Sequence, residues 1–164
     1  MIDLYRSTVQ ASDVSEGEDR PGKGAALNCQ SIVIRLKCDG ATALLAGDMQ
    51  FVKPEVGGLQ DTMLQLREAV VDEGPYSFIK TSHHTSYNGL DEALLQEWLP
   101  TKYFAHSGGT NDASHPDAKT LQLLDENTKR LRWARTDRNG RVTVKMSRGR
   151  VSFDVEHGKL NDAT

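Results

Sequence analysis

The stretch SIVIRLKCDGATALLAGD, residues 31–48, predicts two strands joined by a tight turn. Apolar and polar residues alternate over 31–38, which is the pattern of a strand with one buried face. Asp39-Gly40 is a dipeptide that favours a two-residue hairpin turn, and the apolar run at 41–48 returns from that turn. We therefore expect an antiparallel strand pair at the start of the ordered chain.

Helical and strand patterns alternate after this pair. The spacing of apolar residues predicts helices at 55–73, 90–99 and 115–127, and short apolar runs predict strands at 77–82 and 102–107. Strand patterns close the chain at 131–136, 141–146 and 151–155. Pro116 is expected in the first turn of the third helix, with Asp117 near its N-terminus. This order is typical of an α/β (α+β layered) sheet.

The size of the chain predicts one domain. Its 164 residues are enough for one core and leave little room for a second. Residues 6–27 are polar, rich in Gly, and nearly free of large apolar side chains, so they predict a loop. We expect a flexible lead-in over 1–26, one domain over 27–156, and a tail over 157–164.

Composition excludes several kinds of protein. No apolar run approaches the roughly 18 residues that span a bilayer, and MIDLYRSTVQ lacks the apolar block of a signal peptide. We therefore expect a soluble, cytoplasmic chain with no membrane segment. Cys29 and Cys38 have no CxxC spacing, which argues against a thiolate zinc site and a disulfide framework, so both are expected to be free thiols or buried small side chains.

Charge gives a local signal only. The net charge of −3 does not indicate that the chain as a whole binds nucleic acid. Residues 129–150, however, contain nine Lys or Arg and the single acid Asp137. The simpler interpretation is that these are solvated faces of alternating strands. The alternative is a basic binding face on the C-terminal strands.

Polar clusters directly follow three predicted strands. Asp48 ends the second strand, His83 and His84 follow the strand at 77–82, and a loop that reaches His115 follows the strand at 102–107. Loops at the carboxyl ends of strands converge on one crevice in α/β sheets. Neutral imidazole and carboxylate are the groups that bind zinc, manganese or iron. These side chains therefore predict a shared site.

Each of these residues also has a purely structural interpretation. An Asp after Gly at a strand end is commonly a turn residue, and a His-Pro pair before a helix can serve as a cap. The paired histidines can simply occupy a polar turn, although two buried imidazoles would both need partners. His106, inside a strand, and His157, in the tail, have weaker claims to a chemical role.

Four segments together resemble the competence-type, ComEC-like hydrolases of the metallo-β-lactamase superfamily. They are LNCQSIVIRLKCDGATALLAGD (27–48), FIKTSHHTS (78–86), GGTNDASHPDAKTLQLL (108–124) and RTDRNGRVTVKM (135–146), in unbroken order. The resemblance implies the C-terminal half of an αββα sandwich that binds metal and hydrolyses phosphodiester bonds. The second strand of that family also ends in Gly-Asp, and its histidine loop reads His-His-Gly-Ser.

The resemblance also implies roles for particular residues. Asp48 and His83 correspond to metal ligands, for zinc or manganese held weakly by this chain. His84 and His115 correspond to catalytic groups that transfer a proton or contact phosphate. The cation would activate water and neutralise charge on the attacked phosphoryl group. The substrate is expected to be a nucleic acid or another phosphodiester. The residues that would bind it are Asn28, Ser86 and Asn111.

The chain departs from the family pattern in three places. The His-x-His-x-Asp-His metal motif of the family's first half has no counterpart, because every histidine lies at or beyond position 83. Thr85 replaces the usual Gly, and Asp112 and Ala113 replace a basic and an aromatic residue. We therefore expect a fragment of a longer chain, a subunit completed by a partner chain, or an inactive relic. The alternative is a non-catalytic module that binds nucleic acid or protein through the basic C-terminal strands.

Overall fold

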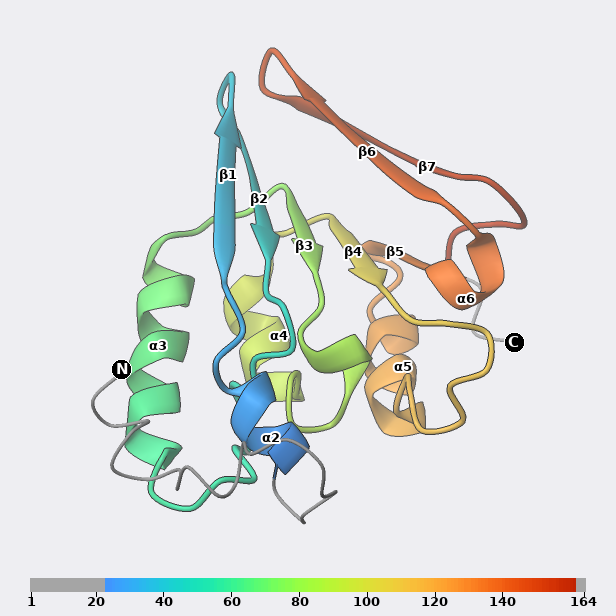
Figure 1. Ribbon diagram of the computed structural model, residues 1–164. Helices are drawn as coiled ribbons and strands as arrows, with labels where there is room; N and C mark the ends of the chain where they lie inside the picture. The colour runs from blue at the N-terminus through green and yellow to red at the C-terminus, as the bar shows by residue number, and fades with distance from the viewer. Residues whose placement is uncertain (1–22, 162–164) are drawn as a thin grey trace.

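A five-stranded sheet organises residues 23–161, which are the residues described by this computed structural model (Figure 1). The strands lie in the order in which they occur along the chain: β1 (Ile34–Cys38), β2 (Ala41–Leu45), β3 (Phe78–Lys80), β4 (Tyr103–His106) and β5 (Arg132–Arg135). The predicted hairpin is confirmed, because β1 pairs antiparallel with β2. Strands β2 to β5 are parallel, so their carboxyl ends meet at one edge.

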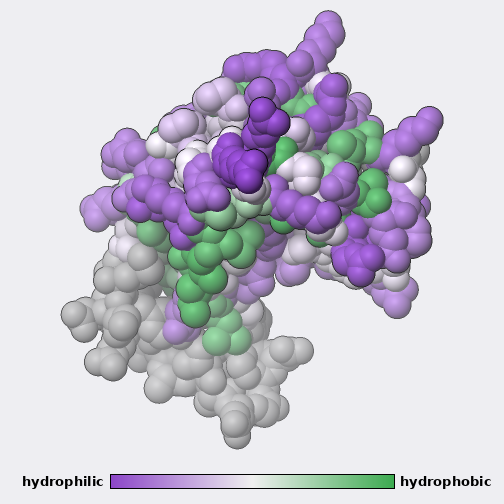
Figure 2. Space-filling view, turned by 90° about the horizontal axis from the view of Figure 1, so that it is seen from above, coloured by the Kyte–Doolittle hydropathy of each residue, from purple (hydrophilic) through white to green (hydrophobic). Residues whose placement is uncertain are grey.

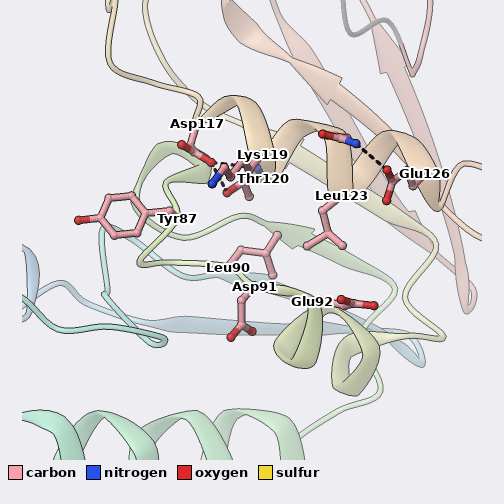
Figure 3. Close-up of a pocket in the computed structure, with 10 residues that line it drawn as sticks. Tyr87, Leu90, Asp91, Glu92, Asp117, Lys119, Thr120, Leu123 and Glu126 are labelled. Atoms are coloured by element: carbon pink, nitrogen blue, oxygen red, sulfur yellow. Dashed lines mark hydrogen bonds between the residues drawn. The ribbon is translucent and has the colours of Figure 1, made fainter.

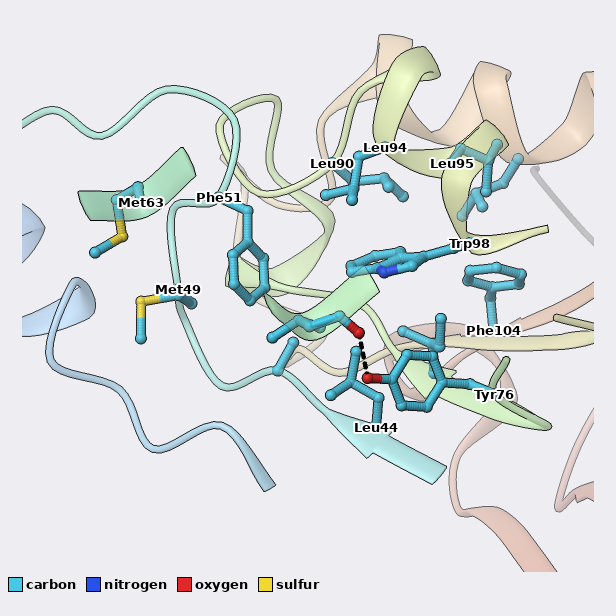
Figure 4. Packing of buried hydrophobic residues seen from close by; sticks show 14 of the residues in the cluster. Leu44, Met49, Phe51, Met63, Tyr76, Leu90, Leu94, Leu95, Trp98 and Phe104 are labelled. Carbon is cyan, nitrogen blue, oxygen red and sulfur yellow. Dashed lines mark hydrogen bonds between the residues drawn. The ribbon is translucent and has the colours of Figure 1, made fainter. Parts of the chain in front are cut away.

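Helices cover one face of this sheet. They are α3 (Gln60–Asp72), α4 (Glu92–Trp98) and α5 (Ala118–Glu126), while the short helices α2 (Lys23–Asn28) and α6 (Thr136–Asn139) precede β1 and follow β5. The larger core cluster joins alternate strand residues such as Leu44, Ile79 and Phe104 to side chains of α3, α4 and α5 (Figure 4). Within it, Phe51 and Trp98 pack edge to face at 6.2 Å. Residues of opposite parity along each strand point to the other face.

A separate β-hairpin covers part of that second face. Strands β6 (Val142–Ser147) and β7 (Arg150–Val155) pair with each other and form their own two-stranded sheet. Phe153 packs against Phe78 and Tyr103, with ring centroids 5.9 and 5.2 Å apart. Figure 1 shows the hairpin crossing above the sheet from the side of β5 toward the β1–β2 turn, where the Cys38 thiol lies 3.7 Å from the carbonyl oxygen of Met146.

Strand β1 departs from the half-buried pattern that its sequence predicts. Ile34 and Leu36 are 42% and 44% exposed, and Ile32 just before the strand is 78% exposed. The reason is position: within the described residues β1 is an edge strand paired with β2, and Ile34 and Leu36 belong to neither core cluster. Seen from above, apolar surface emerges between largely hydrophilic regions (Figure 2).

Two details of the sequence prediction are wrong. Residues 23–28 form helix α2, so the predicted loop does not extend to 27, and the earlier part of that loop lies outside the described residues. Pro116 is not in the first turn of a helix, because α5 begins at Ala118. Asp117 is its N-cap instead, and its carboxylate accepts a 2.9 Å hydrogen bond from the Thr120 amide.

Other predictions are confirmed at the level that the structure tests. The fold is a mixed α/β arrangement of parallel and antiparallel strands with helices. Cys29 and Cys38 are free thiols, the first of them buried. Within residues 23–161, none of the helices combines the length and the apolar composition needed to cross a bilayer.

Candidate functional site

Three histidines gather at the edge where the parallel strands end. His83 and His84 form the short turn η2 (His83–Thr85) after β3, and His115 lies on the loop between β4 and α5. The ring centroid of His115 is 5.3 Å from that of His83 and 5.8 Å from that of His84, and the two neighbours are 6.5 Å apart. Asp48, after β2, adjoins this histidine cluster.

His83 is held on both ring nitrogens. Its Nδ1 lies 2.6 Å from Oδ1 of Asn88, and the side-chain amide of Asn88 donates in turn to Glu55 at 3.1 Å. Because the amide NH₂ of Asn88 donates to Glu55, it is the amide oxygen of Asn88 that faces His83. The Nδ1 atom of His83 must therefore carry the proton. The Nε2 atom is then an acceptor, and it receives the amide of Asn28 at 2.8 Å.

His84 has the same proton arrangement and contacts Asp48. Its Nδ1 bonds to the backbone carbonyl of Ser107, which can only accept, so Nδ1 carries the proton. Its Nε2 lies 3.4 Å from Oδ1 of Asp48. In the neutral ring, two acceptors would face each other at that distance. A cation placed between these two atoms would be held by both of them.

His115 is oriented by its own loop. Its Nδ1 lies 3.1 Å from Oδ2 of Asp112 and 3.0 Å from the hydroxyl of Ser114. Asp112 also accepts from the backbone and the hydroxyl of Ser114, and these bonds hold the pKa of its carboxyl well below the usual range. An ionised carboxylate can only accept, so the Nδ1 proton of His115 points to Asp112 and Nε2 is free to accept.

Lys80 is a part of the site that the sequence did not reveal. Its ammonium donates to the carbonyl of Gly47 at 2.9 Å and lies 3.7 Å from Asp48. Burial lowers the pKa of this lysine, and the Asp48 charge partly offsets the effect. A single Lys at the end of a strand gives no sequence signal, because only the pairing of β2 with β3 brings it beside Asp48.

The turn that carries the histidines is left-handed. His83, His84 and Thr85 have φ angles of 43, 49 and 60°. A β-branched residue is strained in this region, which normally suits Gly. Fully buried Thr85 is held there by its hydroxyl, 2.6 Å from that of Thr81 and 3.2 Å from Nδ1 of His106.

His106 supports the turn from inside the sheet. It is 1% exposed, and burial lowers its pKa to about 4, so the ring is neutral. Its Nε2 lies 3.7 Å from Asp137 and has no hydrogen-bond partner within the described part of the chain. Asp137 is itself bound by Arg135 through two nitrogens, at 2.6 and 3.1 Å.

The structure brings most of the predicted site residues together. The histidine cluster and Asp48 adjoin one another, and Asn28 contacts His83. Ser86, predicted to bind substrate, is only 3% exposed, and its backbone closes the turn by bonding to His83. Asn111 is exposed on the loop before α5. His157 lies apart from the cluster, bonded through its backbone to Asn139.

The donor atoms suit a divalent cation in kind but do not surround one. Histidine ligands of metals present one ring nitrogen and donate the other N–H to an outer acceptor, as these three rings do. Within residues 23–161, however, no three His, Cys, Asp or Glu side chains come close enough to hold a metal ion. The prediction of Asp48 and His83 as ligands stays a prediction, and it is His84 that contacts Asp48.

A separate hollow between α4 and α5 contains none of these groups. It measures about 310 Å³, and Leu90 and Leu123 line it beside Tyr87 (Figure 3). Its charged side chains are mostly acidic, including Asp91 and Glu126. The hollow therefore does not belong to the histidine site.

Comparison with known proteins gives one partial similarity. No protein-family model matches the chain, and no solved structure matches it. Over 131 residues the chain is 28% identical to ComE operon protein 3 of Bacillus subtilis (strain 168). The match covers 80% of this chain and 15% of that protein, so the chain spans a small part of the relative's length. The chain is thus similar to one segment of a ComE operon protein.

Proposed function

We propose that residues 27–155 form part of a metal-dependent hydrolase centre of metallo-β-lactamase type that cleaves phosphodiester bonds, as in nucleic acid. One observation carries the proposal. His83, His84 and His115 each have Nδ1 beside an oxygen acceptor, which leaves the Nε2 atoms as acceptors in one cluster next to Asp48. A polar turn with a purely structural role does not require three imidazole rings that all carry the proton on Nδ1.

The contacts suggest how the roles are divided. Asp48 and His84 are the pair that faces a cation, because their acceptor atoms lie 3.4 Å apart. His115, whose Nδ1 is held by Asp112, is assigned proton transfer to a leaving oxygen. His83 is the more deeply buried of the pair, and its Nε2 is engaged by Asn28.

A divalent ion, zinc or manganese, would neutralise charge on the phosphoryl group and activate water. Its remaining ligands would come from a preceding segment of a longer protein or from a partner chain. The chain matches a segment that makes up 15% of the length of a ComE operon protein. This partial match supports a larger assembly and a link to competence.

Metal titration and phosphodiesterase assays of the longest natural form of the protein test the proposal. We expect Mn²⁺ or Zn²⁺ binding that Asp48→Asn and His84→Gln weaken at least about tenfold, together with loss of cleavage of bis(p-nitrophenyl) phosphate. His157→Gln, in an exposed histidine, is the matched control. Metal affinity and activity that are unchanged in Asp48→Asn would exclude the proposal.

A second candidate, a non-catalytic nucleic-acid-binding module, rests on the outer face of the β6–β7 hairpin. A hollow of about 490 Å³ there is lined only by basic and hydroxyl side chains: Lys145, Ser147, Arg148, Arg150 and Ser152. DNA binding that persists in EDTA, falls steeply with salt, and disappears in a Lys145, Arg148 and Arg150 triple Ser variant would favour this candidate. Binding that depends on Asp48 instead would exclude it.

A further inference from the structure

A polar cavity adjoins the histidine cluster on the side of β5 and α6. It measures about 420 Å³ and is lined by side chains of the loop before α5 and of the segment 135–138. His115 belongs both to this cavity and to the histidine cluster. A ligand group bound in the cavity would therefore lie next to any group held at the histidines.

The two carboxylates of the cavity are already satisfied. Asp137 accepts two hydrogen bonds from Arg135, at 2.6 and 3.1 Å, so this pair contributes little net charge. Asp112 accepts from the backbone amides of Ser114 and His115 and from both of their side chains. Neither carboxylate needs a further cation.

Arg138 is the cation of the cavity that no carboxylate of the described residues pairs with. Its side chain lines the space, it is exposed, and it takes part in no ion pair or hydrogen bond within residues 23–161. A guanidinium group presents a planar fork of donors that matches the oxygens of phosphate. Arg138 is thus the side chain of this cavity whose chemistry suits a phosphate group.

We propose that Arg138 anchors a second phosphate of the substrate, the one that flanks the phosphodiester group at the histidines. The inference rests on the proposed function for the identity of the neighbouring group, and it narrows the substrate class to chains with successive phosphates, such as oligonucleotides. Arg138 determines specificity here and takes no part in bond cleavage.

Binding of thymidine dinucleotides with and without a terminal 5′-phosphate tests this proposal. We expect the wild-type protein to bind the phosphorylated form about tenfold more tightly, which is the effect of one charge-assisted phosphate contact. Arg138→Ala should lose this preference. Arg141→Ala is the matched control, because it removes the same charge three residues further on and outside the cavity. An equal preference in the wild type and in Arg138→Ala would overturn the proposal.

Inorganic phosphate locates the contact independently. In ¹⁵N-resolved NMR spectra, phosphate should shift the amides of residues 108–115 and 136–140. Shifts confined to the basic β6–β7 hairpin would overturn the proposal. Neither measurement involves hydrolysis, so the phosphate subsite can fail while the chain still cleaves phosphodiesters, and it can stand while cleavage is absent.

Discussion

At the scale of single side chains, Asn88 decides which nitrogen of His83 is protonated. The orientation of Asn88 is fixed by Glu55, whose carboxylate accepts a 3.1 Å hydrogen bond from the amide NH₂ of Asn88. This chain of contacts resembles the outer acceptors that orient histidine ligands in metal sites. The groups that orient the imidazoles thus come from separate segments, since only Asn88 lies in the loop of the paired histidines while Glu55 and Ser107 lie outside it.

Asn88→Ala should destabilise the fold and allow His83 to adopt either tautomer. The buried Nδ1–H loses its acceptor, which costs about 1–3 kcal/mol of unfolding free energy. Urea denaturation measures the loss, and imidazole ¹⁵N shifts should show mixed protonation of the two nitrogens. Asn111→Ala, at an exposed site, should change stability by less than about 0.5 kcal/mol. An unperturbed His83 spectrum in Asn88→Ala would contradict the assignment.

His106 should make the fold sensitive to acid. Burial lowers its pKa from 6.5 to about 4, so the unfolded chain binds more protons than the native state between these values. Its stabilising effect is complete above pH 6.5 and is lost as the pH falls toward 4, by about 3 kcal/mol in all.

Denaturation of His106→Gln across that pH range checks the prediction. The variant lacks the titrating ring, so its stability should fall less steeply between pH 6.5 and pH 4 than that of the wild type. His157→Gln should follow the wild-type curve, because the side chain of His157 is 67% exposed. Parallel curves for the wild type and His106→Gln would show that His106 is not the group responsible.

At the scale of elements, the segment after β4 must pass closely over His106. A Cβ built on Gly108 would lie 2.6 Å from Nε2 of that ring, whereas one on Gly109 would meet nothing within 4 Å. The ring cannot move aside easily, because it is packed inside the sheet at 1% exposure.

Gly108→Ala should therefore lower the unfolding free energy by about 1–3 kcal/mol through overpacking. Gly109→Ala, one residue further along, should stay within about 0.5 kcal/mol of the wild type. Chemical denaturation of the two variants in parallel gives the comparison. Equal stability of both variants would mean that the His106 ring can relax into space that the structure does not show.

At the scale of the whole molecule, helices cover one face of the sheet within residues 23–161, and the β6–β7 hairpin together with Leu160 covers part of the other. Several apolar side chains of the hairpin pack on the sheet, and the most buried of them is Phe153, against Phe78 and Tyr103. In the edge strand β1, Ile34 and Leu36 belong to neither core cluster and stay partly exposed.

Phe153→Ala should cost about 3 kcal/mol and loosen the hairpin, because it removes a ring that is 8% exposed between two layers. Hydrogen exchange of the β6 and β7 amides should accelerate more than that of β3 and β4. Ile34→Ala, at 42% exposure, should change stability by about 0.5 kcal/mol. Uniform acceleration across both sheets would show that the hairpin does not unfold locally.

Much of this molecule was determined by local sequence. The Asp39-Gly40 hairpin, the alternation of strands and helices, and the placement of Asp48, His83, His84 and His115 after strands all follow from periodicity and turn chemistry, which act over a few residues. Local patterns overstated the burial of β1 and missed helix α2, because tertiary contacts decide which face of an edge strand is covered and whether a short segment with few large apolar residues becomes a helix.

Only the tertiary structure decided what the site residues do to one another. It paired Asp48 with His84 rather than with His83, set Lys80 beside Asp48, and placed His106 beneath the turn with Asp137. These contacts join segments 21 to 36 positions apart. Their distances and proton positions depend on the register of neighbouring strands and on the left-handed turn at 83–85, and no local pattern of residues encodes either one.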